Sequence, residues 1–196
     1  MVKKLILLFF ITACITGVQG QSFSLPVPES WRVESLPFPI EFAPQIPYTG
    51  LEHVRFLPGW GDTKSEELWS YCFLWLILPD SKITKESLER DLTAYYSGLV
   101  GRNIIRRKID STLVVPTIAA FEEVGKAKGD SKTYAGNVNM LDYMSLRPVT
   151  LHIEVHQMPC QNEGKLAVFF AVSPQPKTHA IWNQFSMVHE GFRCSK

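Results

Sequence analysis

The order of hydrophobic and polar residues indicates both strands and helices, and its clearest run is LWSYCFLWLIL, residues 68–78, which is apolar at almost every position. Successive side chains of a strand point to opposite faces, so a strand of this kind must be covered on both sides. Trp69, Tyr71, Phe73 and Trp75 share one of these faces, and we call them the aromatic row. The run predicts a central strand of a sheet.

Two helices and five further strands follow from the same reasoning. Apolar residues recur at helical spacing after Thr84 and after Thr178, which are candidate N-caps. Short connections between alternating runs favour antiparallel neighbours. The order β-β-α-β-β-β-β-α therefore predicts an α+β fold, in which two helices pack on a largely antiparallel sheet of five to six strands. The further strands are expected at 51–57, 111–122, 132–144, 149–158 and 164–173.

Residues 21–50 contain six prolines. Each proline fixes φ and removes a hydrogen-bond donor, so long regular elements are not expected in this segment. Apolar residues such as Trp31 and Phe38 lie between the prolines, which favours an extended arm on the domain surface. A mobile tether is the alternative. A single α+β domain is expected to span residues 51–196.

The first residues, 1–20, have the layout of a secretory signal peptide, with Lys3 and Lys4 before a largely apolar run and small residues before Gln21. The run of fourteen residues is shorter than the roughly 20 that span a bilayer. The segment ITAC, which ends at Cys14, also resembles a bacterial lipobox. We expect an exported protein, periplasmic or extracellular, and the alternative is a protein that is lipid-anchored through Cys14.

The charge of the chain argues against nucleic-acid binding. The sequence has 20 basic and 19 acidic residues, without the basic patch that a nucleic-acid partner would require. Its hydrophobic content of 45% is enough for a folded core. No segment after the leader is apolar over a length that could cross a membrane, so no transmembrane span is expected.

Three cysteines remain after the leader, and disulfides persist in exported proteins. Cys160 follows a predicted strand and Cys194 follows the last predicted helix, so a disulfide between them would clamp that helix to the sheet. Cys72 lies in an apolar strand and is expected to be a small buried hydrophobe. The alternative for Cys160 is a reactive thiol paired with His156, which would need an orienting third group.

His152, Glu154 and His156 alternate with apolar residues in VTLHIEVHQM and so share one face of a strand. Two imidazoles and a carboxylate are ligands that zinc accepts. The same alternation is expected of any strand with one polar face, and a further ligand is suggested by residue type alone, at His53 or Asp142. We therefore expect a solvated face without a stoichiometric metal ion.

Two features indicate ligand binding. In the loop PGWGDTKSEE, residues 58–67, glycines flank Trp60, and Asp62 begins an acidic cluster. An exposed Trp60 would stack on a sugar or a partner, whereas an inward Trp60 would plug the domain. The aromatic row would line a cavity for an apolar ligand if the sheet and the last helix enclosed one, and otherwise it is core.

The stretch PGWGDTKSEELWSYCFLW and the FRC after the last helix resemble small secreted bacterial proteins of uncharacterised activity, which implies export and no particular chemistry. A G-x-S-x-G elbow, an H-E-x-x-H motif and a P-loop are missing. The sequence therefore predicts a non-catalytic exported module that binds a small apolar molecule, a glycan or a partner in the cell envelope, without a cofactor. A hydrolase or metal-dependent enzyme with an unrecognised site is the alternative.

Overall fold

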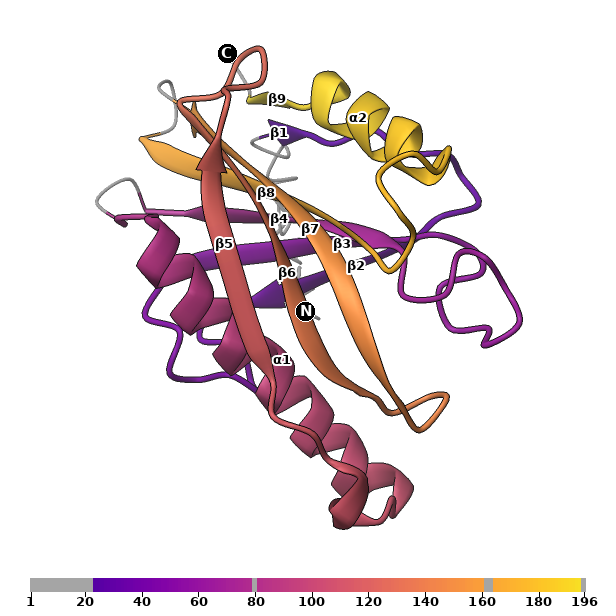
Figure 1. The fold of residues 1–196 in the computed structure, drawn as a ribbon. Helices are drawn as coiled ribbons and strands as arrows, with labels where there is room; N and C mark the ends of the chain where they lie inside the picture. Colours follow the sequence, from indigo (N-terminus) through magenta and orange to yellow (C-terminus); the bar gives the residue numbers. More distant parts are fainter. Residues whose placement is uncertain (1–22, 79–80, 161–163, 195–196) are drawn as a thin grey trace, which may run out of the picture.

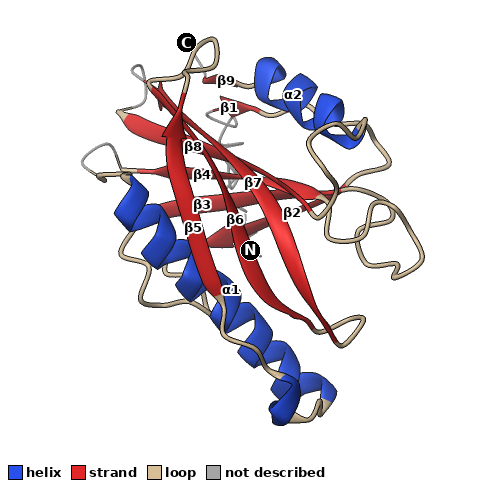
Figure 2. Ribbon diagram, viewed as in Figure 1, coloured by secondary structure: helices blue, strands red, loops and turns tan. Residues whose placement is uncertain are grey.

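The computed structural model describes residues 23–78, 81–160 and 164–194. The predicted leader, residues 1–20 with Cys14, and the following Gln21 therefore lie outside the described residues. The described chain forms a seven-stranded antiparallel sheet, a small two-stranded sheet and two α-helices (Figures 1 and 2). The predicted α+β fold is confirmed. Within the described part, neither helix combines the length and the apolar character that a membrane span requires.

The large sheet has the strand order β2-β3-β4-β8-β7-β6-β5, and every neighbouring pair is antiparallel. The small sheet pairs β1 with β9. A short 3₁₀ turn follows the first helix. The bounds are β1 Phe23–Ser24, β2 Arg32–Pro37, β3 Gly50–Phe56, β4 Tyr71–Ile77, α1 Lys85–Arg107, the 3₁₀ turn Ser111–Leu113, β5 Ile118–Val124, β6 Lys132–Asp142, β7 Arg147–Cys160, β8 Lys165–Ser173, α2 Ile181–Gly191 and β9 Arg193–Cys194.

Strand β4 is covered on both faces, as its sequence predicts, and all its residues are buried. The side chains of Tyr71, Phe73 and Trp75 belong to a core that also contains residues of α1. Cys72 and Leu74 point the other way, into a second core that contains residues of α2. Because alternate residues of one strand face opposite sides, the two helices cover opposite faces of the sheet.

Helix α1 begins after Thr84, the predicted N-cap. The Ser87 N–H donates to Thr84 Oγ1 at 3.2 Å, and the Thr84 N–H donates to Ser87 Oγ at 2.9 Å. This reciprocal capping box satisfies two backbone donors that the first helical turn leaves without partners. Lys108 ends the helix in a left-handed conformation, with φ of 55°.

Helix α1 also covers one edge of the large sheet. Strand β5 is the last strand on that side. The N–H groups of Ala119 and Phe121 in β5 donate to Thr93 Oγ1 at 3.1 Å and to Glu89 Oε1 at 3.0 Å. An edge strand normally leaves a row of such groups unpaired. Here two side chains of the helix occupy the place of a neighbouring strand.

The proline-rich segment contributes more to the fold than its composition indicates. Strand β2 pairs with β3 along its whole length and forms the second edge of the large sheet, which accounts for a seventh strand beyond the five to six expected. Ile40 and Ile46 are buried in the core under α1. Trp31 belongs to the core under α2. Proline is tolerated here because Pro37 is the last residue of an edge strand.

Cys160 and Cys194 form the predicted disulfide, which ties the end of β7 to β9. The alternative of a reactive Cys160 beside His156 is therefore wrong, because a bonded sulfur is no nucleophile. Cys72 is free and buried, as expected. Burial raises the pKa of its thiol, so Cys72 stays protonated and inert.

Candidate functional site

A pocket of about 240 Å³ opens at one end of the aromatic row. Trp60, Trp69 and Tyr71 line it together with Tyr95 and Leu99 of α1. We call this cavity the aromatic pocket. The sequence suggested a cavity under the last helix. The aromatic pocket lies under the first helix instead, because the aromatic row faces the core that α1 covers.

The structure divides the aromatic row between the pocket and the core. Trp69 and Tyr71 line the aromatic pocket, whereas Phe73 and Trp75 lie deeper and are fully buried. The ring of Phe73 stacks on that of Phe170, with centroids 4.3 Å apart. The ligand-binding role expected for the whole row is therefore limited to its first two members.

Most of the loop 58–67 is exposed, but its Trp60 points inward. The ring of Trp60 is half-buried and lies 4.6 Å from that of Phe56 and 5.8 Å from that of Trp69, measured between centroids. Trp60 is thus a wall of the aromatic pocket and not an exposed stacking platform. Asp62 is exposed, and its Oδ1 accepts the Lys64 N–H at 2.9 Å, so its carboxylate shapes the turn outside the aromatic pocket.

Trp69 has an unusual backbone conformation. It lies two residues before the start of β4 and has a φ of 57°, in the left-handed region. This conformation costs a bulky residue about 1–3 kcal/mol, and such strain concentrates at functional sites. The Trp69 N–H donates to the carbonyl oxygen of Trp60 at 3.0 Å, and its side chain is fully buried. The two tryptophans that line the pocket are therefore held in place by their own backbone.

Three buried N–H groups of residues that line the aromatic pocket have no hydrogen-bond partner within the described part of the chain. They are Nε1 of Trp60, Nε1 of Trp69 and Nε of Arg102. Buried donors are nearly always paired, and an unpaired one costs about 1–3 kcal/mol. The three residues line one cavity, and a ligand with hydrogen-bond acceptors that reached these atoms would supply the missing partners.

Positive charge surrounds the same pocket. Arg32, Arg102 and Arg107 line it, and each guanidinium lies over an aromatic ring at 4.4 to 5.0 Å from the centroid. Arginine stacked in this way keeps its donors in a fixed plane. Glu34 is the acidic residue that lines the pocket, and its carboxylate pairs with Arg32 at 3.3 Å. The pocket is therefore apolar in its walls, and its charged lining groups are three arginines and one glutamate.

A fully buried carboxyl group, Glu52, lies behind the aromatic pocket. Tyr95 Oη donates to it at 2.8 Å and Trp75 Nε1 donates at 2.9 Å. Burial raises the pKa of Glu52 to about 7, although these two hydrogen bonds oppose the change. Glu52 therefore carries a proton in the folded chain at a pH where an exposed glutamate would be ionised.

The predicted histidine–glutamate face is not one site. His152 Nδ1 lies 2.6 Å from Asn137 Oδ1 in an exposed position. Glu154 Oε1 pairs with Lys177 Nζ at 3.1 Å. His156 is buried, so the expected solvated face ends before it. These three residues face one side of β7, and Glu154 Oε2 lies 4.0 Å from His156 Nε2, but the shortest contacts of the three lead to different neighbours.

His156 instead belongs to a cluster with Asp130 and His189. Asp130 Oδ2 lies 2.8 Å from His156 Nδ1, and Asp130 Oδ1 lies 3.0 Å from His189 Nε2. Thr133 Oγ1 also donates to Asp130 Oδ2, at 2.5 Å. Burial alone would raise the pKa of this carboxyl, but the hydrogen bonds from His156, His189 and Thr133 hold it well below its usual range.

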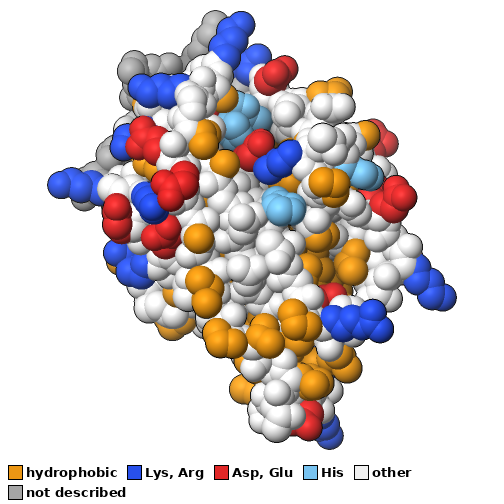
Figure 3. All heavy atoms as spheres, in the orientation of Figure 1, with side chains coloured by type: hydrophobic (Ala, Val, Ile, Leu, Met, Phe, Trp, Pro, Cys, Tyr) orange, Lys and Arg blue, Asp and Glu red, His pale blue; other side chains and the backbone are white. Residues whose placement is uncertain are grey.

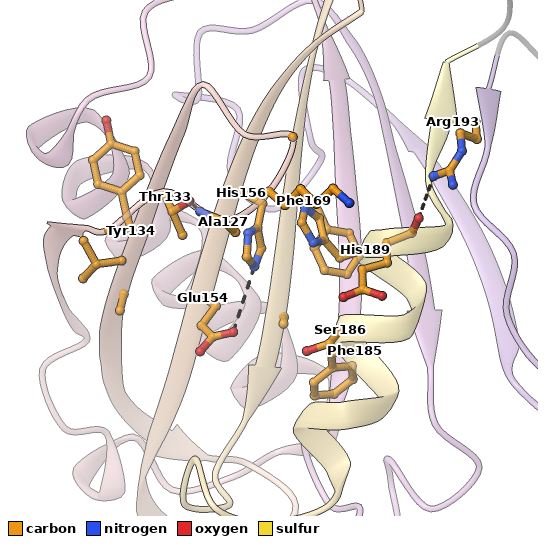
Figure 4. Close-up of a pocket in the computed structure, with 17 residues that line it drawn as sticks. Ala127, Thr133, Tyr134, Glu154, His156, Phe169, Phe185, Ser186, His189 and Arg193 are labelled. Carbon is orange, nitrogen blue, oxygen red and sulfur yellow. Dashed lines mark hydrogen bonds and ion pairs between the residues drawn. The ribbon is translucent and has the colours of Figure 1, made fainter.

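The two histidines line a second pocket, of about 750 Å³, between the large sheet and α2. In Figure 4, His156 and Glu154 extend from the sheet, and His189 and Ser186 extend from the helix. Figure 3 shows histidines among acidic and basic groups on the upper part of this face, and apolar side chains on its lower part. We call this cavity the histidine pocket.

No protein-family model matches the chain, and neither a curated protein nor a solved structure matches it. The chemistry of the two pockets is therefore the basis for a functional conclusion.

Proposed function

We propose that the protein is a non-catalytic exported binding protein and that the aromatic pocket holds a small, flat apolar molecule with a carboxylate or similar anionic group. The three unpartnered N–H groups of Trp60, Trp69 and Arg102 carry this proposal. A carboxylate offers about four acceptor positions and would satisfy them. The apolar part of the ligand would pack against the aromatic walls.

The polar groups of the pocket support binding over catalysis. Indole and guanidinium groups donate hydrogen bonds but keep the same protonation state near neutral pH. Burial raises the pKa of Tyr71, Tyr95 and Tyr143, so these lining residues stay neutral. Such a set can hold an anion. The carboxylate of Glu34, which also lines the pocket, is paired with Arg32 at 3.3 Å, and a single paired carboxylate does not supply both the general acid and the general base that a hydrolase requires.

The volume of the aromatic pocket sets the size of its ligand. About 240 Å³ is less than the roughly 300–1,000 Å³ of pockets for drug-sized molecules. One ring or two fused rings with a short acidic substituent suit this volume. A glycan suits it less well, because Trp60 faces inward and does not offer an open stacking surface.

Export is part of the proposal. The leader-like segment 1–20 and the Cys160–Cys194 disulfide support it, as does the resemblance to small secreted bacterial proteins. Cleavage before Gln21 would release a periplasmic or extracellular protein, and attachment through Cys14 would keep it on a membrane surface. In both cases the ligand would come from outside the cytoplasm.

We expect 2-naphthoate to bind the purified chain at one site and its neutral isostere, 2-naphthamide, to bind at least about tenfold more weakly. A hydrogen bond to a charged group contributes about 1.5–3 kcal/mol. Trp69→Phe removes one donor and keeps an aromatic ring. It should therefore weaken naphthoate binding roughly ten- to a hundredfold, and naphthamide binding by less, roughly two- to tenfold, because the amide oxygen accepts a weaker, neutral hydrogen bond. Isothermal titration calorimetry measures both affinities.

Trp182→Phe is the matched control, because Trp182 Nε1 already has a partner, the Gln175 carbonyl oxygen at 3.1 Å, and its ring lies in the core under α2. This variant should bind naphthoate like the parent chain. Equal affinity for naphthoate and naphthamide would contradict the proposal. Equal weakening by the Trp69 and Trp182 substitutions would contradict it as well.

A further inference from the structure

The histidine pocket lies on the opposite face of the sheet from the aromatic pocket, since Phe169 and Phe185, which line it, belong to the core under α2. We propose that Asp130, His156 and His189 bind one divalent transition-metal ion of the zinc type at this pocket. This metal site is independent of the ligand assigned to the aromatic pocket.

The three side chains bring their ligand atoms to one point. One carboxylate oxygen and one nitrogen from each ring all lie within 4.8 Å of one another. Zinc bonds of about 2.0–2.1 Å at tetrahedral angles place neighbouring ligand atoms about 3.3 Å apart. Asp130 Oδ2 lies 2.8 Å from His156 Nδ1 and Asp130 Oδ1 lies 3.0 Å from His189 Nε2, so each histidine contacts a different oxygen of the carboxylate. An ion bound to both rings would replace the shared protons, and the stacked rings would have to tilt to direct their nitrogens at it.

Each ligand is held by a different element of the fold. His156 lies on β7, His189 lies in the last turn of α2, and Asp130 lies in the turn just before β6. The two imidazole rings stack with centroids 3.9 Å apart. The Cys160–Cys194 disulfide links β7 to β9, directly after α2. The two histidines are thus brought together by a covalent link and by packing, before any ion binds.

Residues around the cluster supply the outer contacts that metal ligands usually have. Thr133 Oγ1 donates to Asp130 Oδ2, which orients the carboxylate. Glu154 Oε2 lies 4.0 Å from His156 Nε2, the ring nitrogen that faces away from Asp130 (Figure 4). A carboxylate on that side favours the tautomer whose Nδ1 is free to bind an ion. Lys177 in turn pairs with Glu154.

The ligand set determines the class of ion. Two imidazoles and one carboxylate suit zinc and its neighbours cobalt, nickel and copper, whereas calcium and magnesium prefer oxygen ligands alone. Three protein ligands leave one position of a tetrahedral site open. Both histidines line the histidine pocket, so the open position would face a cavity large enough for water or a small ligand.

The chain, purified without a polyhistidine tag, should retain one equivalent of zinc after loading and dialysis, measured by elemental analysis. Loss of an outer contact of a metal ligand commonly weakens affinity about 10- to 100-fold. His156→Gln and His189→Gln remove ligands, so each should weaken zinc binding by at least about a hundredfold, and Glu154→Gln by about tenfold. Competition with a zinc-sensitive dye measures these changes.

His152→Ala is the matched control, because His152 lies on the same strand but contacts Asn137, and its zinc affinity should equal that of the parent. Retention of less than one equivalent of zinc by the parent chain, or an equal loss of zinc affinity in the His152 variant, would overturn the site.

If a glutamine variant does not fold, electron paramagnetic resonance of the parent loaded with Cu²⁺ decides. We expect nitrogen splitting from two imidazoles, and its absence would overturn the site. Naphthoate binding should be unchanged by zinc, which separates this test from that of the aromatic pocket.

Discussion

Reduction of the Cys160–Cys194 disulfide is expected to lower the free energy of unfolding by about 3–4 kcal/mol. The two cysteines are 34 residues apart, and the entropy of closing a loop of this length in the unfolded chain gives about that value. Net stabilities of domains are about 5–15 kcal/mol, so the loss would be a large fraction of the total. The bond also holds β9 beside β1, at the end of α2.

Urea denaturation of the oxidised chain and of a Cys160→Ser, Cys194→Ser double variant measures this effect. Cys72→Ala is the control, since it removes a free thiol and leaves the loop closed. Alkylation of the reduced native chain should modify Cys160 and Cys194 and spare Cys72 until the protein unfolds. A double variant with the same denaturation midpoint as the oxidised chain would show that the bond does not stabilise the fold.

The contribution of Glu52 to the stability of the chain should fall by about 3 kcal/mol as the pH rises from about 4.5 to about 7. His53, whose pKa burial lowers to about 4, has the opposite effect in this window, so the contribution of Glu52 is read from a comparison with a variant. Below this window the carboxyl is protonated in both states. Within it, the folded chain keeps a proton that the unfolded chain has lost, since burial raises the pKa of Glu52 from 4.5 to about 7. The unfolded state then binds fewer protons, so stability decreases with rising pH. Each unit of pKa change corresponds to about 1.4 kcal/mol.

Glu52→Gln removes this titration and keeps an oxygen that can accept a hydrogen bond from Trp75 or Tyr95. Relative to the parent, the variant should therefore gain about 3 kcal/mol in unfolding free energy as the pH rises from about 4.5 to about 7. Glu122→Gln is the control, because Glu122 is exposed on β5. A difference between the parent and Glu52→Gln that is constant with pH would contradict the assignment to Glu52.

The periodic elements of this fold could be predicted because their patterns directly reflect the faces that they bury. The capped start of α1 at Thr84 and the two-sided burial of β4 are examples. Strand β2 was not predicted, because five of its six residues are exposed and three of them, Arg32, Glu34 and Ser35, are charged or polar. Its place is set by pairing with β3, and such pairing leaves no period in its own sequence.

The candidate sites could be predicted only in part, for a similar reason. Trp60, Trp69 and Tyr71 are close in sequence, and their pattern indicated a wall of aromatic rings. Whether an indole N–H has a hydrogen-bond partner depends on residues that are distant in the sequence. The unpaired donors could therefore not be predicted from the local sequence pattern. His156 was recognised as a candidate ligand, but with neighbours from its own strand. Its actual partner Asp130 is 26 residues away, in a segment that indicated only a turn.

The hydrogen bonds between β5 and α1 bear on how the protein behaves when it is concentrated. Fibrils grow when the free edge of one sheet recruits a strand from another molecule. At β5, an incoming strand would first have to displace Thr93 and Glu89 from the N–H groups of Ala119 and Phe121. At the opposite edge, β2 is short, carries charged side chains and ends at Pro37. We therefore expect both edges of the sheet to resist pairing with a strand of another molecule, although the central strand is apolar throughout.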